Sequence, residues 1–79
     1  MIALEVNKKI MKEIKITIEP LLLQNFLKLL DFTSTGGQAK YFLAEHEVKV
    51  NEEKETRRGR KLYAGDKVEV DKQEFLLTK

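Results

Sequence analysis

The sequence predicts an α+β domain in which two packed helices lie on a small, mostly antiparallel sheet. Two stretches carry apolar residues at helical spacing, and several short stretches alternate apolar and polar residues, as strands with one buried face do. The chain has 79 residues, of which 42% are apolar and 35% charged. This length suits one small core and is too short for two. We therefore expect a single domain over residues 1–79.

The N-terminal part of the chain predicts a strand followed by a helix. Three isoleucines alternate with polar residues, which indicates a strand over residues 13–18. Pro20 suits the opening turn of a helix, and a stripe of Leu and Phe at helical spacing predicts that helix over residues 21–31. Residues 1–10 show no clear period, so we expect this decapeptide to be dispensable for folding.

A glycine-containing turn introduces the second helix. Thr35 and Gln38 have the spacing of a capping box, in which the two side chains bind free N–H groups at a helix start. The apolar stripe that follows predicts a helix ending near His46, which we interpret as a helix-end residue. The two helices are expected to meet through four apolar side chains: Phe26, Leu27, Phe42 and Leu43.

Three short apolar stretches complete the predicted sheet. Residues 48–50 and 68–70 each place a charged residue between two valines, which is typical of a half-buried strand. Residues 75–77 could form a last strand that pairs with the first.

The charge distribution singles out one segment, the basic loop at residues 54–61 (KETRRGRK). It holds five cations and one anion, and so a net charge of +4, whereas the whole chain carries +2. Arg57, Arg58 and Arg60 offer planar donors that suit phosphates, and Gly59 would allow a close approach. A solvated charge run is the alternative interpretation. Glu55 and its neighbouring acids are expected to be solvated.

The turn before the second helix is a second candidate phosphate site. Gly36 and Gly37 leave backbone N–H groups accessible at a helix start, although these glycines taken alone favour a simple capped turn. Gln38 and Lys40 would flank the same groove. Tyr41 could stack on an unpaired base, or it could be partly buried.

Several functional classes have no support in the sequence. There is no cysteine and one His without a second ligand at metal-binding spacing, so we expect no metal and no cofactor. No apolar stretch is long enough to cross a membrane, and no signal peptide is recognisable, which predicts a cytoplasmic protein. Nucleophile and base motifs are absent, so we expect neither catalysis nor a small-molecule substrate.

The order helix, glycine turn, helix, V-x-V-N, basic loop, G-D-x-V-x-V resembles the S4 RNA-binding domain of ribosomal protein S4, pseudouridine synthases and bacterial tyrosyl-tRNA synthetases. The resemblance covers about residues 22–70. The positions that fit the family pattern are Leu23, Leu27, Ala39, Leu43, Val48, Val50, Asn51, Gly65 and Asp66. Residues 34–40, 48–51 and 57–62 are most similar to the small stand-alone S4 proteins of the YaaA type.

This resemblance implies an S4-like fold with its αL motif, an L-shaped helix pair. It also implies binding of structured RNA without catalysis, with ribosomal RNA during assembly or on the ribosome as the leading candidate. We expect a monomer, although the sequence does not decide the oligomeric state. The implied RNA-binding residues are Gly36, Gly37, Gln38, Lys40, Tyr41, Lys49, Asn51, Arg57, Arg58, Arg60 and Lys61. Four positions depart from the family: Leu22 and Gly36 stand where many members have Arg, Glu52 stands where Gly usually follows Asn, and His46 replaces a frequent Gly at the end of the second helix.

Two other functions stay open at this point. The basic loop could bind an acidic protein surface, which would make the chain an interaction adaptor, or it could bind DNA. The sequence does not decide which RNA is bound or which process it serves.

Overall fold

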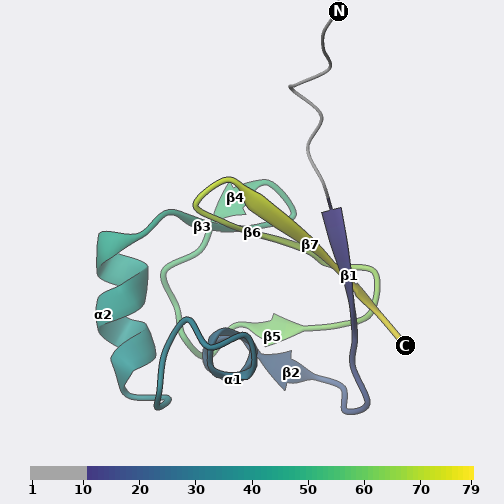
Figure 1. Ribbon diagram of the computed structural model, residues 1–79, viewed down its shortest axis with the longest axis horizontal. Coiled ribbons are helices and arrows are strands. Elements are labelled where there is room, and N and C mark those ends of the chain that lie inside the picture. The colour runs from purple at the N-terminus through teal and green to yellow at the C-terminus, as the bar shows by residue number, and fades with distance from the viewer. Residues whose placement is uncertain (1–10) are drawn as a thin grey trace, which may run out of the picture.

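The computed structural model describes residues 11–79, so the predictions made for residues 1–10 lie outside the described residues. The predicted α+β architecture is confirmed. A five-stranded sheet lies over two helices and a two-stranded ribbon (Figure 1). In the same view α1 is seen end-on while α2 is seen from the side, so the two helices cross steeply.

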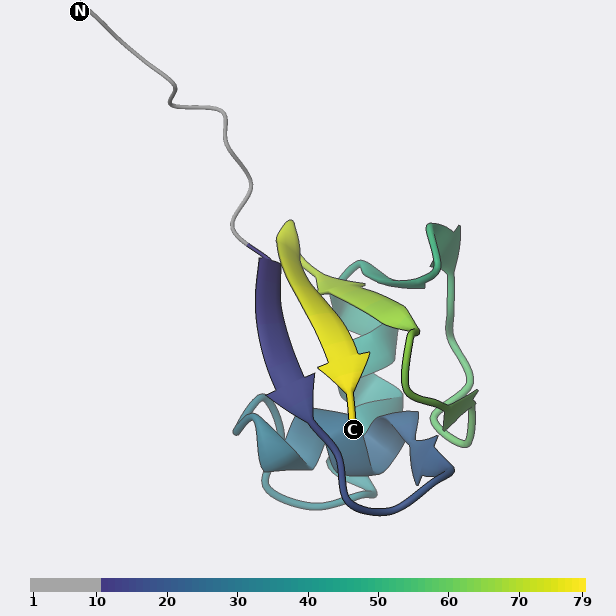
Figure 2. The same cartoon turned by 90° about the vertical axis from the view of Figure 1, so that its right-hand side faces the viewer.

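The five-stranded sheet has the order β1-β7-β6-β3-β4 and is mostly antiparallel, as predicted. Its strands are β1 (Met11–Lys15), β3 (Val48–Val50), β4 (Glu53–Lys54), β6 (Lys67–Val70) and β7 (Gln73–Thr78). The pair β1 and β7 is the exception: these strands run parallel and side by side, as Figure 2 shows. The predicted pairing of the first and last strands is therefore confirmed.

The segment after β1 departs from the prediction. The first strand was expected over residues 13–18, but β1 ends at Lys15 and Ile18 is 69% exposed. Pro20 lies before β2 (Leu21–Leu22), which pairs antiparallel with β5 (Lys61–Leu62). Helix α1 (Leu23–Leu29) begins only after this pairing, so the placement of Pro20 in its first turn is wrong. The ribbon takes the two leucines with which the predicted helix, residues 21–31, was expected to begin.

Helix α2 (Gln38–Glu45) begins at the predicted glycine turn and ends before His46. The Gln38 N–H donates to Thr35 Oγ1 over 3.3 Å, and the Ser34 N–H donates to Gln38 Oε1 over 2.8 Å. The predicted capping box is wrong in detail: the N-cap is Gly37, which has no side-chain cap hydrogen bond, and the Gln38 side chain binds the Ser34 N–H instead of the Thr35 N–H. His46 Nδ1 lies 2.6 Å from Asp71 Oδ2, and this hydrogen bond lowers the pKa of Asp71.

The core lies between the sheet and the helices. Phe26 is completely buried and meets Phe75 edge to face, with ring centroids 5.7 Å apart. Leu27 and Leu43 are buried as expected. Phe42 is only partly buried at the margin, where its ring stacks on His46 at 4.1 Å. The helix pair therefore depends less on Phe42 than the sequence predicted.

Candidate nucleic-acid interface

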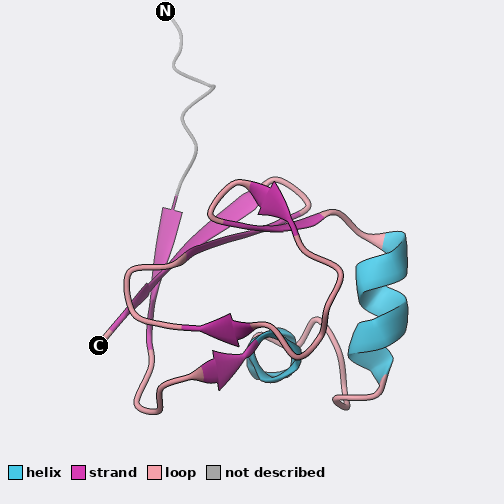
Figure 3. Ribbon diagram, turned by 180° about the vertical axis from the view of Figure 1, so that it is seen from behind, coloured by secondary structure: helices cyan, strands magenta, loops and turns pink. Residues whose placement is uncertain are grey.

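The basic loop leads from β4 to β5 and lies against the start of α1. Figure 3 shows the connection from β4 running down from the sheet and past α1 into β5. The N–H groups of Leu23 and Gln24 donate to the carbonyl oxygens of Arg60 and Arg58 over 2.8 Å and 2.9 Å. Because α1 has no side-chain cap, these carbonyls satisfy the open N–H groups of its first turn. The loop backbone is thereby fixed against the helix.

Glu55 is the centre of this loop, and the expectation that it is solvated is wrong. Its side chain is only 6% exposed. Its carboxylate accepts hydrogen bonds from Arg57 Nε over 2.9 Å, from Arg57 Nη2 over 3.2 Å and from Arg60 Nη1 over 2.7 Å. The Arg57 backbone N–H donates a further bond over 3.0 Å. A buried carboxylate requires such partners, and two arginines, two and five residues further along the chain, supply them.

These contacts decide the charge state of the loop. The hydrogen bond from the Arg57 guanidinium, helped by the Arg57 backbone N–H and by Arg60, outweighs burial and lowers the pKa of Glu55 to about 2. Glu55 is therefore ionised at neutral pH and compensates part of the positive charge of its neighbours.

The cations of the loop differ in how free they are. Arg58 and Lys61 are exposed, and neither forms an ion pair among the described residues. Arg57 pairs with Glu55 although its side chain is 73% exposed, whereas Arg60 is 29% exposed. An open groove of about 440 Å³ is lined by Arg57, Gly59, Arg60 and Lys61. Substituting Arg57 and Arg60 together would leave the Glu55 carboxylate buried without its two guanidinium partners.

The glycine turn adjoins the basic loop. Arg58 Nη1 donates a long hydrogen bond of 3.4 Å to the Gly36 carbonyl oxygen, and a Cβ at Gly36 would lie 3.4 Å from the Gln24 side-chain amide. Gly37 directly precedes α2. The two candidate phosphate sites, 20 residues apart in sequence, therefore form one surface.

Exposed side chains of α2 continue from this turn. Lys40 is exposed, and Tyr41 is 68% exposed, which contradicts partial burial and leaves its ring accessible. The Gln38 amide oxygen is used in the helix cap. Tyr63, which the sequence did not single out, is 47% exposed just after β5. Its place two residues beyond Lys61 was the signal available.

The structure gives Asn51 and Lys49 other contacts. The Asn51 amide donates to Asp66 Oδ1 over 3.1 Å and accepts the Lys67 N–H over 3.0 Å. Asp66 Oδ2 in turn accepts the Tyr63 N–H over 2.8 Å. Asn51 thus joins the end of β3 to the turn before β6. Lys49 is half-buried, with Nζ 3.6 Å from a carboxylate oxygen of Glu47.

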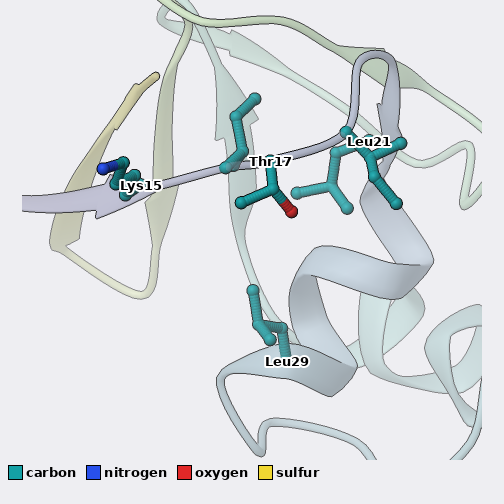
Figure 4. Close-up of a pocket in the computed structure, with 6 residues that line it drawn as sticks. Lys15, Thr17, Leu21 and Leu29 are labelled. Atoms are coloured by element: carbon teal, nitrogen blue, oxygen red, sulfur yellow. The ribbon is translucent and has the colours of Figure 1, made fainter.

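A second hollow of about 230 Å³ lies away from the cations of the basic loop, and its lining is mostly apolar. Figure 4 shows Leu29 on α1 pointing toward the connection that carries Thr17. Ile18 and Leu29 on this side are 69% and 59% exposed. Among residues 11–79, Lys15 is the one cation that lines this hollow, so the basic loop is the better candidate for an anionic polymer.

Residues 11–79 provide neither a metal-binding cluster nor a membrane-spanning helix. This part of the chain contains no group of three or more His, Cys, Asp or Glu residues that could hold a metal ion. Its helices are also too short and too polar to cross a membrane.

Comparison with known proteins assigns the family. A model of the S4 domain matches residues 14–78. The chain belongs to the S4 domain family. This S4 domain is 57% identical, over 58 residues, to the probable ribosome maturation protein RlbA of Bacillus subtilis (strain 168), a match that covers 73% of this chain and 82% of RlbA. No solved structure matches it significantly.

Two family features of this S4 domain now have a physical reason. The Asn of V-x-V-N and the Asp of G-D-x-V-x-V are Asn51 and Asp66, which bind each other directly. Asn51 and Glu52 form the two-residue turn between β3 and β4, with φ of 52° and 73°. A positive φ at both central residues favours Asn followed by Gly. Glu52, where many S4 domains have Gly, is therefore strained.

Proposed function

We propose that this S4 domain binds structured RNA without catalysing a reaction, through the surface formed by the basic loop and the glycine turn. The family assignment supports RNA as the ligand. The observation that carries the proposal is the fixed position of the loop: its carbonyls bind the first turn of α1, while Arg58 and Lys61 stay exposed. We also propose that α1, α2 and this loop form the αL motif.

Ribosomal RNA is the proposed target. The similarity to a probable ribosome maturation protein supports a role in ribosome assembly. We further propose that the protein acts in the cytoplasm and as a monomer. In an A-form duplex the base edges lie in a deep, narrow groove, so a rigid helix pair with exposed cations reads shape and phosphate spacing. A junction or bulge in the RNA would supply specificity, and Tyr41 would be available to stack on an unpaired base.

Salt dependence tests the proposal. The full chain is titrated with a folded fragment of ribosomal RNA at several salt concentrations. Arg58→Gln combined with Lys61→Gln should flatten the slope of log affinity against log salt by about 1.4 to 1.8, since each phosphate contact contributes about 0.7 to 0.9. These cations are chosen because neither holds Glu55 in the fold.

The matched control removes two exposed lysines elsewhere, Lys12 and Lys72, by substitution with Gln. It should change the slope much less than the loop variant, because a contact made at the loop is local. Equal salt slopes for the two double variants would show that the basic loop is not part of the RNA-binding surface.

The same titration separates the rival functions. A DNA duplex of the same sequence should bind more weakly, because only RNA offers the 2′-OH and A-form geometry. Equal binding of both duplexes would favour a DNA-binding module. A protein partner that excess RNA cannot displace would favour an interaction adaptor.

A further inference from the structure

The basic loop contains a charge that opposes its proposed use. Five cations surround Glu55, and an ionised carboxylate among them weakens the attraction of the loop for phosphate. A role in neutralising surplus charge would require only an exposed acid. Glu55 is instead 6% exposed and has no side-chain oxygen without a hydrogen bond.

The geometry of the contacts indicates what Glu55 does. Arg57 binds both carboxylate oxygens through Nε and Nη2, and Arg60 binds Oε1 through Nη1. This fork fixes the plane of the Arg57 guanidinium. The Glu55 N–H also donates to the Val48 carbonyl oxygen over 2.9 Å, so the backbone that carries the carboxylate is tied to the sheet. The two arginines are thus positioned relative to the fold and not only to each other.

Arg57 is held in this way while most of its side chain faces solvent. With 73% of the side chain exposed, an arginine without such contacts would sample many rotamers and lose that freedom on binding. Glu55 removes this cost in advance. Arg57 and Arg60 both line the groove of about 440 Å³.

We propose that Glu55 is a positioning residue that holds Arg57 and Arg60 in one arrangement, so that the loop prefers folded RNA of matching phosphate spacing over flexible RNA. This inference rests on the proposed RNA binding.

The proposal and simple electrostatics predict opposite results for Glu55→Gln. The substitution adds one positive charge to the loop, so electrostatics alone strengthens binding to every RNA and steepens the salt slope. Loss of positioning weakens binding to folded RNA even though the loop has become more positive. Flexible RNA adapts to either arrangement, and its affinity should be unchanged or slightly higher.

The experiment compares two RNA probes, a bulged hairpin from ribosomal RNA and single-stranded poly(U), on the full chain. Glu55→Gln should lower the ratio of hairpin to poly(U) affinity about tenfold, which corresponds to about 1.4 kcal/mol. Glu53→Gln is the matched control, because it makes the same charge change at an exposed residue of β4. It should leave the ratio unchanged. If Glu55→Gln changes the ratio of hairpin to poly(U) affinity no more than Glu53→Gln does, the inference is overturned.

Arg57→Lys provides a second test that does not depend on the stability of Glu55→Gln. It keeps the charge of a largely exposed residue and removes the fork, so the protein should fold and the ratio should fall while the salt slope stays the same. If Glu55→Gln also folds, adding Arg57→Lys to it should lower the ratio little further, because both changes break one contact.

The outcomes separate the two proposals. An unchanged ratio in Arg57→Lys overturns the positioning role. Wild-type protein that binds neither probe overturns the proposed function and this inference with it. Wild-type binding with a normal salt slope, but with no effect of Glu55 beyond that of its control, overturns the inference alone.

Discussion

Acid should weaken this fold through Glu55, and the direction follows from its pKa. The folded-state pKa of about 2 lies below the ordinary value of 4.5. A group whose pKa is lowered on folding stabilises the protein fully above its unfolded pKa and loses that contribution as pH falls through the folded pKa. The contribution of Glu55 should therefore be complete above about pH 5 and disappear toward pH 2.

The size of this contribution can be bounded from the contacts. A change in pKa from 4.5 to about 2 corresponds to at most about 3 kcal/mol of unfolding free energy. Glu55 is buried, but Arg57 is 73% exposed, and solvent screens that half of the pair. We therefore expect about 1 to 2 kcal/mol at neutral pH.

Urea unfolding of wild type and Glu55→Gln between pH 2.5 and 7 measures this difference. Glu55→Gln should be less stable at pH 7 by about 1 to 2 kcal/mol, and the gap should shrink to a fraction of that at pH 2.5. The pKa values of Glu19 and Asp71 are also lowered, by hydrogen bonds from the Ala64 N–H and from His46 respectively. Their contributions to the unfolding free energy are lost in acid equally in both proteins, so they do not affect the difference. Glu53→Gln should follow wild type at every pH. A gap that stays constant from pH 7 to 2.5 would refute the assignment of this pKa to the ion pairs of Glu55.

Four further expectations concern stability and are checked by thermal or urea melts. Asn51→Ala should cost about 1 to 3 kcal/mol, because it removes the two side-chain hydrogen bonds that join the end of β3 to Asp66 and Lys67; an unchanged melt would show that the turn holds without them. Glu52→Gly should stabilise by about 0.5 to 1 kcal/mol, since glycine tolerates a φ of 73° and the exposed ion pair that is lost is worth little; a destabilised variant would contradict the strain at this turn. Phe26→Ala should cost about 3 to 5 kcal/mol and Phe42→Ala clearly less, because only the first ring is fully buried, so equal losses would reverse our view of the helix pair. Removal of residues 1–10 should cost less than about 2 kcal/mol, and a larger loss would assign this decapeptide a structural role.

Local patterns predicted the elements whose neighbours agree with them. The valine pairs of β3 and β6 face the core on alternate positions, and the side-chain hydrogen bonds of the turn before α2 join residues within one turn of its start. Where the prediction failed, a distant partner decided the outcome. Leu21 and Leu22 fit a helical stripe, but they pair with residues 61 and 62 and so belong to a ribbon.

The candidate site shows the same division. Charge density located the basic loop, because it is a property of consecutive residues. Burial of Glu55 depends on the Val48 carbonyl and on how the loop folds back over α1, which no local period encodes. Asn51 was assigned to RNA from the resemblance, whereas its amide is already used on both sides by Asp66 and Lys67.

The parallel pairing of β1 with β7 has a consequence for synthesis of the protein. Met11 pairs with Glu74 and Lys15 with Thr78, so β1 lacks its neighbour until nearly the whole described chain has left the ribosome. Contacts this distant in sequence form late in folding. On a translating ribosome, β1, α1, α2 and the basic loop all emerge before β7, and the edge of the sheet closes only after residues 73–78 have followed them.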